Sequence, residues 1–301
     1  TVQPYTLTVT KSDIAVSKTY DGTTAVANSN VMGKLGYTAP SFGDELSITY
    51  TSAAYNDANV ASANKVTFSG LKVEGAKAAN YKLDVTSFNV VATISKALLT
   101  IKAKDNTIIY GDAPAENGFT VVSGLCGNDT AGVVTGVTYT YNYTQNGNVG
   151  SYTITPAGGE AANYEVKTYE SGTLTVNPKA LTADAITAIG TVTYNGKAQA
   201  PALNVVDGTK VLTADTDYTA VYSNNTNAGT AKVVITGKGN YSGTAEQTFT
   251  INKKPVTVTS GIAAVNREYN GTTVVELDCT KAVFGGLIDG DNLTVAATGT
   301  M

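Results

Sequence analysis

The sequence predicts an all-β protein made of small β-sandwich modules of the immunoglobulin-like kind, joined head to tail. Three observations support this prediction: a recurring nine-residue phrase, a recurring order of turn motifs, and a composition suited to strands and turns. Of the 301 residues, 42% are hydrophobic and 15% are charged. Typical soluble domains carry about 25% charged residues. The chain is therefore apolar enough to fold and has a weakly charged surface.

The nine-residue phrase predicts where the modules meet. Each copy ends one period-2 run with Thr-Val or Thr-Ile and soon starts another, which is typical of a strand-to-strand connection. The copies are TVQPYTLTV at 1–9, TISKALLTI at 93–101, TVNPKALTA at 175–183 and TINKKPVTV at 250–258. They divide the chain into modules at 1–96, 97–178, 179–253 and 254–301. The last of these lacks the later motifs, so we expect an incomplete module there.

Proline at three of these connections predicts stiff joints. Pro4, Pro178 and Pro255 each fix φ and remove a backbone donor, which discourages one sheet from running into the next. We therefore expect an elongated rod rather than a globule. Small-angle scattering distinguishes the two, because a globule of this length has a radius of gyration near ~19 Å. A rod built from such modules has one near ~30 Å.

Within each period, turn motifs recur in one order. A tyrosine runs into a Gly-containing turn, then comes an Asn-led turn, and then an Asn-Tyr pair before the closing strand. The first motif is TYDGTT at 19–24, IYGDAP at 109–114, TYNGKA at 193–198 and EYNGTT at 268–273. The later motifs are NVAS, NVGS and NAGT at 59–62, 148–151 and 227–230, and AANY, AANY and KGNY at 78–81, 161–164 and 238–241. We expect the recurring tyrosines to plug the ends of each module's core: Tyr20, Tyr110, Tyr194, Tyr269, Tyr81, Tyr164 and Tyr241.

Strand patterns complete the fold prediction of five to seven strands per module and no long helix. Residues 217–223 and 230–236 are predicted partners in the third module. The alternative is a β-grasp-like module with a short helical turn at 124–132 or 286–293.

These motifs resemble repeats of bacterial surface proteins. The first and fourth modules are similar to the YDG domain, in Tyr-Asp/Asn-Gly-Thr-Thr and a later Gly-Asp-x-Leu at 43–46 and 290–293. The second, with Tyr-Gly-Asp, resembles the MBG domain of the YGX type. The third is similar to short Ig-like repeats, in TYNGKA, DGTKVLTADTDY, NNTNAGT and GKGNYSGT. Such repeats occur in tandem arrays and bring no catalytic residue.

The resemblance implies a structural stalk or spacer of a secreted bacterial adhesin, located outside the cell at its surface and supporting cell adhesion. One alternative is that the modules themselves bind a host or microbial surface glycan or protein. A second alternative is an accessory region of a secreted enzyme. We expect the chain to be a monomeric fragment of a longer protein.

The candidate ligand-binding residues are Tyr139, Tyr141 and Tyr143, which alternate with polar residues in the second module. Residues two apart on a strand lie about 6.7 Å apart, so three rings can line up on one face. The other interpretation is a core face or a cross-strand ladder. The absence of tryptophan among 18 tyrosines and 6 phenylalanines argues against a dedicated sugar-binding module.

Several chemistries are disfavoured. The chain has no histidine, which excludes a Ser-His-Asp or Cys-His constellation and a His-containing zinc site. Asp21, Asp112 and Asp207 lie in turn motifs, where aspartate has a structural use. The paired carboxylates at 214–218 and 288–292 match no EF-hand and are interpreted as Asx turns. We predict no enzyme, no cofactor and no metal site.

Charge and cysteine content bound the partners. The formal net charge is −4 and Arg267 is the only arginine, so we expect no nucleic-acid partner. No apolar run approaches the ~20 residues of a membrane span, so we expect no membrane insertion in this segment. Cys126 and Cys279 fall in different modules and are predicted to be small, half-buried residues rather than a disulfide.

Overall fold

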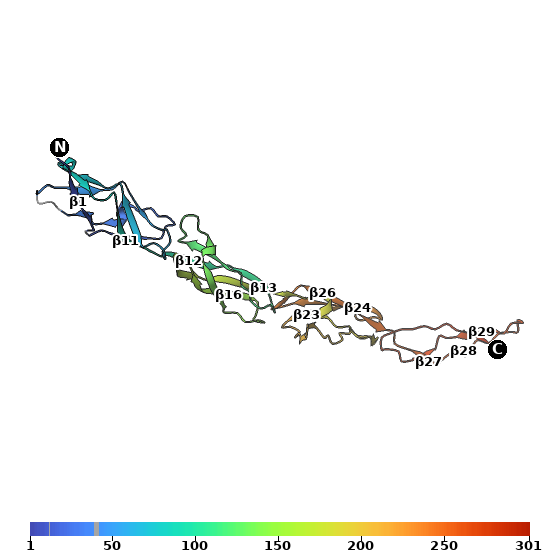
Figure 1. Ribbon diagram of the computed structural model, residues 1–301. Helices are drawn as coiled ribbons and strands as arrows, with labels where there is room; N and C mark the ends of the chain where they lie inside the picture. The colour runs from blue at the N-terminus through green and yellow to red at the C-terminus, as the bar shows by residue number, and fades with distance from the viewer. Residues whose placement is uncertain (12, 39–41) are drawn as a thin grey trace. The chain divides into compact units, whose positions relative to one another are not determined.

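A computed structural model describes residues 1–11, 13–38 and 42–301 of the chain (Figure 1). In these residues strands and turns dominate, and the helical elements are four single 3₁₀ turns: η1 (Asn28–Asn30), η2 (Ala78–Asn80), η3 (Ala131–Val133) and η4 (Ala183–Ala185). The all-β prediction is therefore confirmed. Of the two places where the β-grasp alternative put a helical turn, only 124–132 overlaps one of these, η3.

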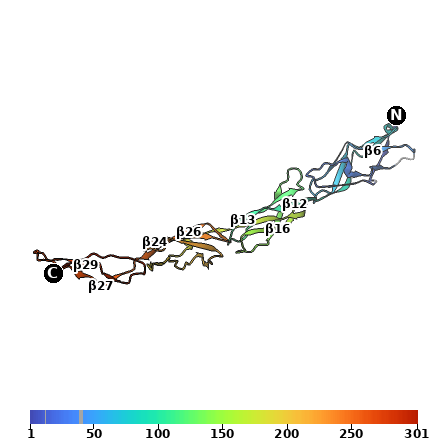
Figure 2. The same ribbon diagram turned by 180° about the vertical axis from the view of Figure 1, so that it is seen from behind.

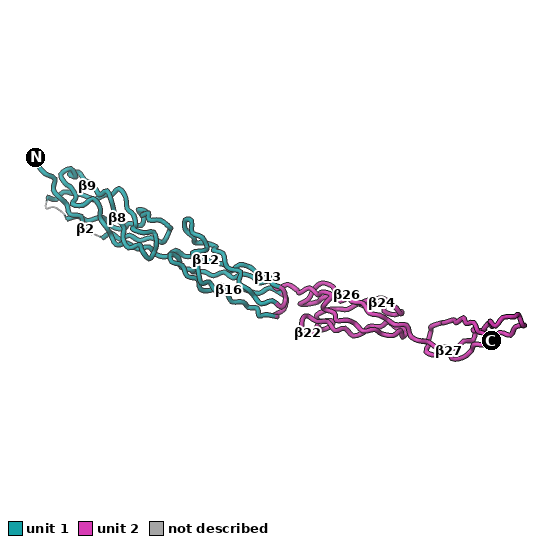
Figure 3. Tube along the Cα trace, turned by 45° about the vertical axis from the view of Figure 1, so that its right-hand side comes forward, with its two compact units in different colours: residues 1–108, 112–145, 150–175 teal, residues 109–111, 146–149, 176–301 magenta. Residues whose placement is uncertain are grey.

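The chain forms two compact units (Figure 3). The first contains residues 1–108, 112–145 and 150–175, and the second contains residues 109–111, 146–149 and 176–301. The first unit thus holds the first module and most of the second. Two turns of the second module, at 109–111 and 146–149, belong to the second unit. Each described sheet nevertheless lies within one predicted module.

The first module is built on a five-stranded sheet. Its strands, in spatial order, are β4 (Val31–Met32), β3 (Ala15–Thr19), β11 (Ser87–Ser95), β8 (Lys65–Ser69) and β7 (Ser52–Tyr55). Two-stranded ladders complete the module: β1 (Tyr5–Leu7) with β10 (Tyr81–Leu83), β2 (Val9–Thr10) with β5 (Gly36–Tyr37), and β6 (Ser47–Thr49) with β9 (Lys72–Glu74). The prediction of five to seven strands is too low here, because turns break the edges into short pieces.

The second module has two sheets, as a sandwich requires. One contains β14 (Phe119–Ser123), β12 (Ala97–Ala103) and β17 (Tyr164–Glu170). The other contains β13 (Asn106–Ile109), β18 (Gly172–Asn177), β16 (Gly150–Glu160) and β15 (Thr135–Tyr141). Apolar residues on alternate positions of both sheets are buried, such as Leu99 and Ile101 on one and Leu174 and Val176 on the other.

The third module is built on one four-stranded sheet, whose strands β24 (Gly229–Gly237) and β26 (Thr244–Asn252) are labelled in Figure 2. This sheet has the order β20 (Val192–Thr193), β26, β24 and β23 (Tyr218–Ser223), and the short ladders of the module are β19 (Lys179–Ala180) with β25 (Tyr241–Ser242) and β21 (Val206–Asp207) with β22 (Lys210–Val211). The antiparallel register of β23 and β24 begins with Tyr218 opposite Gly237. The predicted pairing of 217–223 with 230–236 is therefore confirmed.

The fourth module has two small sheets among its described strands. β27 (Thr257–Ser260) pairs with β30 (Val283–Gly285), and β29 (Val274–Asp278) lies between β28 (Ala263–Ala264) and β31 (Thr298–Thr300). Few of its apolar side chains are buried: Val275 is the one assigned to the core.

Strand-to-strand connections at the nine-residue phrases are as short as predicted. Within the first unit β11 ends at Ser95 and β12 begins at Ala97 (Figure 1). Buried residues fall on even positions up to Ile94 and on odd positions from Ala97. The extra residue therefore turns the opposite face of the strand inward, which ends one sheet and starts the next. We refer to residues 93–101, 175–183 and 250–258 as the first, second and third joints.

Candidate functional site

The joints bring together tyrosines from neighbouring modules, and they are the candidate functional sites. At the first joint β3 runs parallel to β11, with Thr19 opposite Ser95, and the amide of Tyr20 donates to the Ser95 carbonyl at 2.8 Å. On the other side of the joint β17 runs parallel to β12, with Tyr164 opposite Ala97. The end of β3 and the start of β17 therefore lie on the two sides of the connection, so Tyr20 and Tyr164 meet beside it.

The rings of Tyr20 and Tyr164 pack edge to face, with centroids 5.2 Å apart and planes at 78°. Both hydroxyls donate to the same oxygen of Asp129, Oδ2, at 3.0 Å from Tyr20 and 2.6 Å from Tyr164. The amide of Cys126 donates to the Tyr164 hydroxyl at 3.0 Å. Two buried phenols thus share one carboxylate, a charge-assisted arrangement stronger than a neutral hydrogen bond.

Burial and the Asp129 carboxylate both raise the pKa of the two tyrosines. Burial raises the pKa of Tyr20 and of Tyr164, and the hydrogen bonds to Asp129 raise both pKa values further. Each cause favours the neutral phenol, because an anion in the same place would be desolvated and would face the negative Asp129. The first joint is therefore held by protonated tyrosines over the whole neutral range.

An asparagine clamp adds a polar contact at the first joint. The Asn163 side chain accepts from the amide of Val60 at 3.0 Å and donates to Oδ1 of Asn59 at 2.8 Å. The Asn163 carbonyl accepts from the amide of Ala97 at 3.1 Å. The Asn-Tyr motif of the second module thus binds the Asn-led turn of the first, which explains why both motifs recur.

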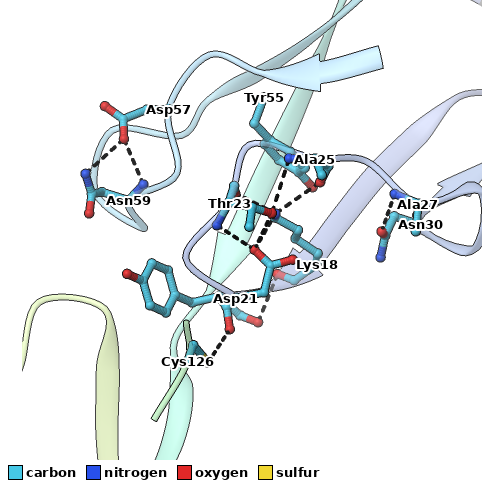
Figure 4. A network of polar contacts seen from close by, with 12 residues as sticks. Lys18, Asp21, Thr23, Ala25, Ala27, Asn30, Tyr55, Asp57, Asn59 and Cys126 are labelled. Carbon is cyan, nitrogen blue, oxygen red and sulfur yellow. Dashed lines mark hydrogen bonds and ion pairs between the residues drawn. The ribbon is translucent and has the colours of Figure 1, made fainter. Parts of the chain in front are cut away.

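A buried lysine shapes the turn that carries Tyr20 (Figure 4). Nζ of Lys18 donates to Oδ1 of Asp21 at 2.7 Å and to the carbonyls of Thr23 and Ala25 at 2.7 and 3.1 Å. It also lies 5.1 Å from the centroid of the Tyr55 ring. Burial raises the pKa of Asp21, but the bonds from Lys18 and Thr23 outweigh burial and lower it overall. Asp21 is a turn residue, as predicted.

The second joint repeats the tyrosine pair with a different polar partner. The amide of Tyr110 donates to the Asn177 carbonyl at 2.8 Å, and Tyr241 lies opposite Lys179 in a parallel ladder. The Tyr110 and Tyr241 rings meet edge to face at 5.4 Å. Nζ of Lys210 donates to the Tyr110 hydroxyl at 3.1 Å and lies over both rings, 5.2 and 5.3 Å from their centroids.

Asp207 takes the place of Asp129 at the second joint. Its Oδ2 accepts from the Tyr241 hydroxyl at 3.2 Å, and its Oδ1 lies 2.5 Å from Nζ of Lys179. Burial is the main cause that raises the pKa of Tyr241 to about 12. The asparagine clamp is also present, since Asn240 accepts from the Val149 amide at 2.8 Å and donates to Asn148 at 2.9 Å.

The third joint has only half of this arrangement. Tyr194 donates its amide to the Asn252 carbonyl at 2.9 Å and its hydroxyl to Oδ1 of Asp291 at 2.8 Å. The hydrogen bond to Asp291 is the main cause that raises the pKa of Tyr194. Residues 254–301 contain no Asn-Tyr pair.

The start of the first module carries a matching face. Tyr81 lies opposite Tyr5 in a parallel ladder and donates its hydroxyl to Asp44 at 2.5 Å. That bond is the main cause that raises the pKa of Tyr81 to about 12. Tyr5 and Phe42 pack edge to face beside it at 5.6 Å, with 46% and 65% of their surfaces exposed.

The tyrosines predicted to plug module ends follow this pattern. Tyr20, Tyr110, Tyr81, Tyr164 and Tyr241 are buried, as expected. Tyr269 is 95% exposed, and there the prediction is wrong. Tyr194 is half-buried.

The predicted ligand-binding tyrosines divide into two groups. Tyr139 and Tyr141 lie on β15 and are half-buried. Burial and then the charge of Glu116 raise the pKa of each. Tyr143 lies beyond the end of β15, is buried, and donates its hydroxyl to the Asp112 carbonyl at 3.2 Å. The three rings therefore do not form one exposed row, and ligand binding by them stays a prediction.

Other predicted polar residues have structural partners. Asp217 accepts from the amide of Thr213, four residues before it, at 2.9 Å, so this contact is not the predicted Asx turn, which reaches the amide two residues further on. Asp291 accepts from the Tyr194 hydroxyl. Cys126 and Cys279 are free and half-buried, as predicted. Within the described residues no helix has the length and apolar character of a membrane span.

Sequence reasoning missed Asp129 and the two asparagine clamps. Asp129 stands outside every recurring motif, so only its contacts identify it. The clamp had a signal, because the Asn-led turn and the Asn-Tyr pair recur together in three modules and are both missing from the fourth.

These joints and sheets define a tandem array of all-β sandwich modules. Residues 3–88 match the family model of the YDG domain, and residues 99–175 match that of the MBG domain of the YGX type. Neither family is enzymatic, and both occur in surface-associated repeat proteins.

Comparison with curated proteins finds no relative of this chain. Among solved structures, Drosophila N-cadherin EC1-4 is similar over 83% of this chain and 75% of its own, with 8% identity and a TM-score of 0.28. The human desmocollin-1 ectodomain is similar over 88% of this chain and 67% of its own, with 8% identity and a TM-score of 0.25.

Proposed function

We propose that this chain is a spacer segment of a bacterial cell-surface adhesin, in which tyrosine-paired joints hold successive β-sandwich modules at a fixed orientation. The observation that carries the proposal is the shared contact of Tyr20 and Tyr164 with Asp129 at the first joint. A joint built only to connect modules needs no buried carboxylate between them. A joint that transmits orientation does need such a contact.

The same construction at two joints supports a mechanical role. The first and second joints both combine a one-residue connection, an edge-to-face tyrosine pair and an asparagine clamp. The polar partners differ, with Asp129 at one and Lys210 with Asp207 at the other. What recurs is therefore the packing of the joint, which supports a role in holding neighbouring modules stiffly.

The kinds of domain support a location outside the cell, at its surface. MBG-type repeats are typical of extracellular surface proteins, and we extend this to the whole chain, with the third module as a short Ig-like repeat and the fourth as a partial YDG-like one. Adhesion itself would then belong to another part of the polypeptide.

The spacer role is tested on the first joint by ¹⁵N relaxation of the full chain. Coupled modules tumble together, so the first and second modules should give one rotational correlation time. Tyr20→Ser should separate their correlation times, while Tyr5→Ser should not. Small-angle scattering provides the second measurement, in which a radius of gyration near ~19 Å, the value of a globule, would contradict the proposal.

A second candidate function is binding of a glycan or protein by the modules. It is favoured by Tyr139 and Tyr141, which are half-buried on β15 and so keep part of each ring at the surface. A glycan and matrix-protein array tests it. Saturable binding that is lost in Tyr139→Ala and Tyr141→Ala but retained in Tyr169→Ala would show that the modules bind a ligand themselves and are not only spacers.

A further inference from the structure

The two Asn-Tyr motifs of the first unit are identical in the middle and carry opposite charges at their ends. The first module contains KAANYK at 77–82, and the second contains EAANYE at 160–165. The third module has GKGNYS at 237–242, with no charge at either end of the motif. The flanking charges are therefore not needed to form a joint, since the third module forms one without them.

A groove beside the first of these motifs is basic. A cavity of about 460 Å³ lies next to Tyr81 and is lined by Lys72 and Lys82. Lys77 adjoins the lining residue Ala78, and the three lysines are exposed. Within the described residues, none of the three makes an ion pair. We call this cavity the basic groove.

The matching groove of the second module is acidic. A cavity of about 610 Å³ lies next to Tyr164 and is lined by Glu160 and Glu165, which are both exposed. Lys96 also lines it, and its Nζ donates to the Ala161 carbonyl at 2.8 Å. Neither glutamate makes an ion pair in the part of the chain that the structure describes. We call this cavity the acidic groove.

Both grooves follow strands that lie at the edge of their sheets. Among the described strands β10 pairs with β1 alone, and β17 is the outer strand of its three-stranded sheet. Each groove also has an exposed apolar residue. Val85 lines the basic groove and is 38% exposed, and Leu98 lies opposite Glu165 and is 54% exposed. An uncovered edge with charged and apolar groups is suited to contact with another chain.

We propose that the basic groove of one copy of this chain binds the acidic groove of a second copy, so that the chains associate side by side. A second copy fits because the two motifs place two lysines and two glutamates at the same spacing on corresponding strands. Contact between like modules would bring lysine against lysine or glutamate against glutamate, which disfavours it. The first module of one copy therefore meets the second module of the other. This association is independent of the spacer function, which is tested at the first joint.

Sedimentation velocity of the full 301-residue protein gives the first test. Association should be reversible and depend on concentration. It should strengthen as the salt falls from about 1 M, where the Debye length is about 3 Å, to about 0.01 M, where it is about 30 Å. The formal net charge of −4 makes two copies repel each other overall. Strengthening at low salt therefore indicates that complementary groups meet.

Charge reversal tests the two grooves separately. The acidified variant carries Lys77→Glu and Lys82→Glu, and the basified variant carries Glu160→Lys and Glu165→Lys. Each places like charges in both grooves, so the self-association of each should weaken at least about tenfold.

A matched control separates the grooves from the net charge. Lys34→Glu with Lys104→Glu changes the net charge as much as the acidified variant does, at exposed positions that line neither groove. At about 0.1 M salt, where charges more than about 10 Å apart are largely screened, this control should associate as the unaltered protein does.

Mixing the two variants gives the most specific result. The acidified variant has glutamates at both grooves and the basified variant has lysines at both, so an equimolar mixture should form heterodimers although neither variant associates alone. Fluorescence-detected sedimentation with one variant labelled measures this. Misfolding of a variant cannot imitate a gain of association.

Three results would overturn the proposal: an unaltered protein that stays monomeric at every concentration and salt, self-association that both variants retain, and a mixture without heterodimers. An acidic polysaccharide is a competing occupant of the basic groove. Saturable binding of polygalacturonate to a chain that remains monomeric, lost in the acidified variant, would assign that groove to a glycan instead.

Discussion

Tyr20 and Tyr164 belong to different modules, yet their rings meet edge to face at 5.2 Å and their hydroxyls donate to one oxygen of Asp129. Parallel pairing on the two sides of a one-residue connection produces this contact. The first joint is therefore part of the core of its unit, since Tyr20, Tyr164, Ile94 and Leu99 belong to one buried cluster.

Removal of the shared carboxylate should destabilise the first unit. We expect Asp129→Ala to lower the free energy of unfolding by about 2–4 kcal/mol, because each buried hydroxyl left without an acceptor costs about 1–3 kcal/mol. Urea unfolding measures the change. Glu170→Ala, at an exposed position of the same unit, is the control and should change it by less than about 0.5 kcal/mol. Equal effects of the two variants would show that the carboxylate has no special role.

Lys18, on β3 beside the turn that carries Tyr20, should be important for stability. The Lys18 side chain is only 4% exposed, and Lys18→Met keeps its length while leaving the Thr23 and Ala25 carbonyls without their donor. We expect a loss of about 2–3 kcal/mol in denaturant unfolding. Lys65→Met, at an exposed position of β8 in the same sheet, serves as the control and should be close to neutral.

Lys210 should contribute more modestly to the second joint. Lys210→Met removes the hydrogen bond to the Tyr110 hydroxyl and the contact with both rings. Because Lys210 is exposed, we expect a loss of about 0.5–1 kcal/mol, the range of a cation–π contact at the surface. The midpoint of thermal unfolding should fall for Lys210→Met and stay unchanged for Lys197→Met. A larger loss in Lys197→Met would contradict the assignment.

The protein should lose stability at alkaline pH. Unfolded tyrosine has a pKa of 10.0, and the folded pKa of Tyr81 and of Tyr241 is raised to about 12. A raised folded pKa means that folding favours the neutral phenol, so this stability is complete below pH 10 and is lost as pH rises through about 12. Urea unfolding at successive pH values and the ultraviolet absorbance of tyrosinate measure the effect.

Replacing Asp44 tests the cause of the alkaline transition, and replacing Glu45 is the control. Since the hydrogen bond to Asp44 is the main cause of the raised pKa of Tyr81, Asp44→Ala should let one tyrosine titrate at a lower pH. Glu45→Ala, next in sequence and exposed, should leave the titration as it is. Unchanged titration curves for both variants would show that the hydrogen bond to Asp44 is not what raises the pKa of Tyr81.

Local sequence was enough for the strands, the turns and the connections. Alternating apolar residues predicted the pairing of β23 with β24, and the nine-residue phrase predicted where β11 passes into β12. These features depend on a few neighbouring residues, so a short stretch of sequence shows both their periodicity and their turn residues. The predicted row of Tyr139, Tyr141 and Tyr143 was less accurate, because the strand ends at Tyr141 and the next tyrosine turns into the interior.

The sequence by itself determined that the protein is a tandem array of β-modules whose tyrosines recur at fixed points. Only the tertiary structure decided what those tyrosines contact, because parallel pairing joins strands that are distant in the chain and no local pattern specifies their register. That pairing placed Tyr20 against Tyr164 and brought Asp129 between their hydroxyls.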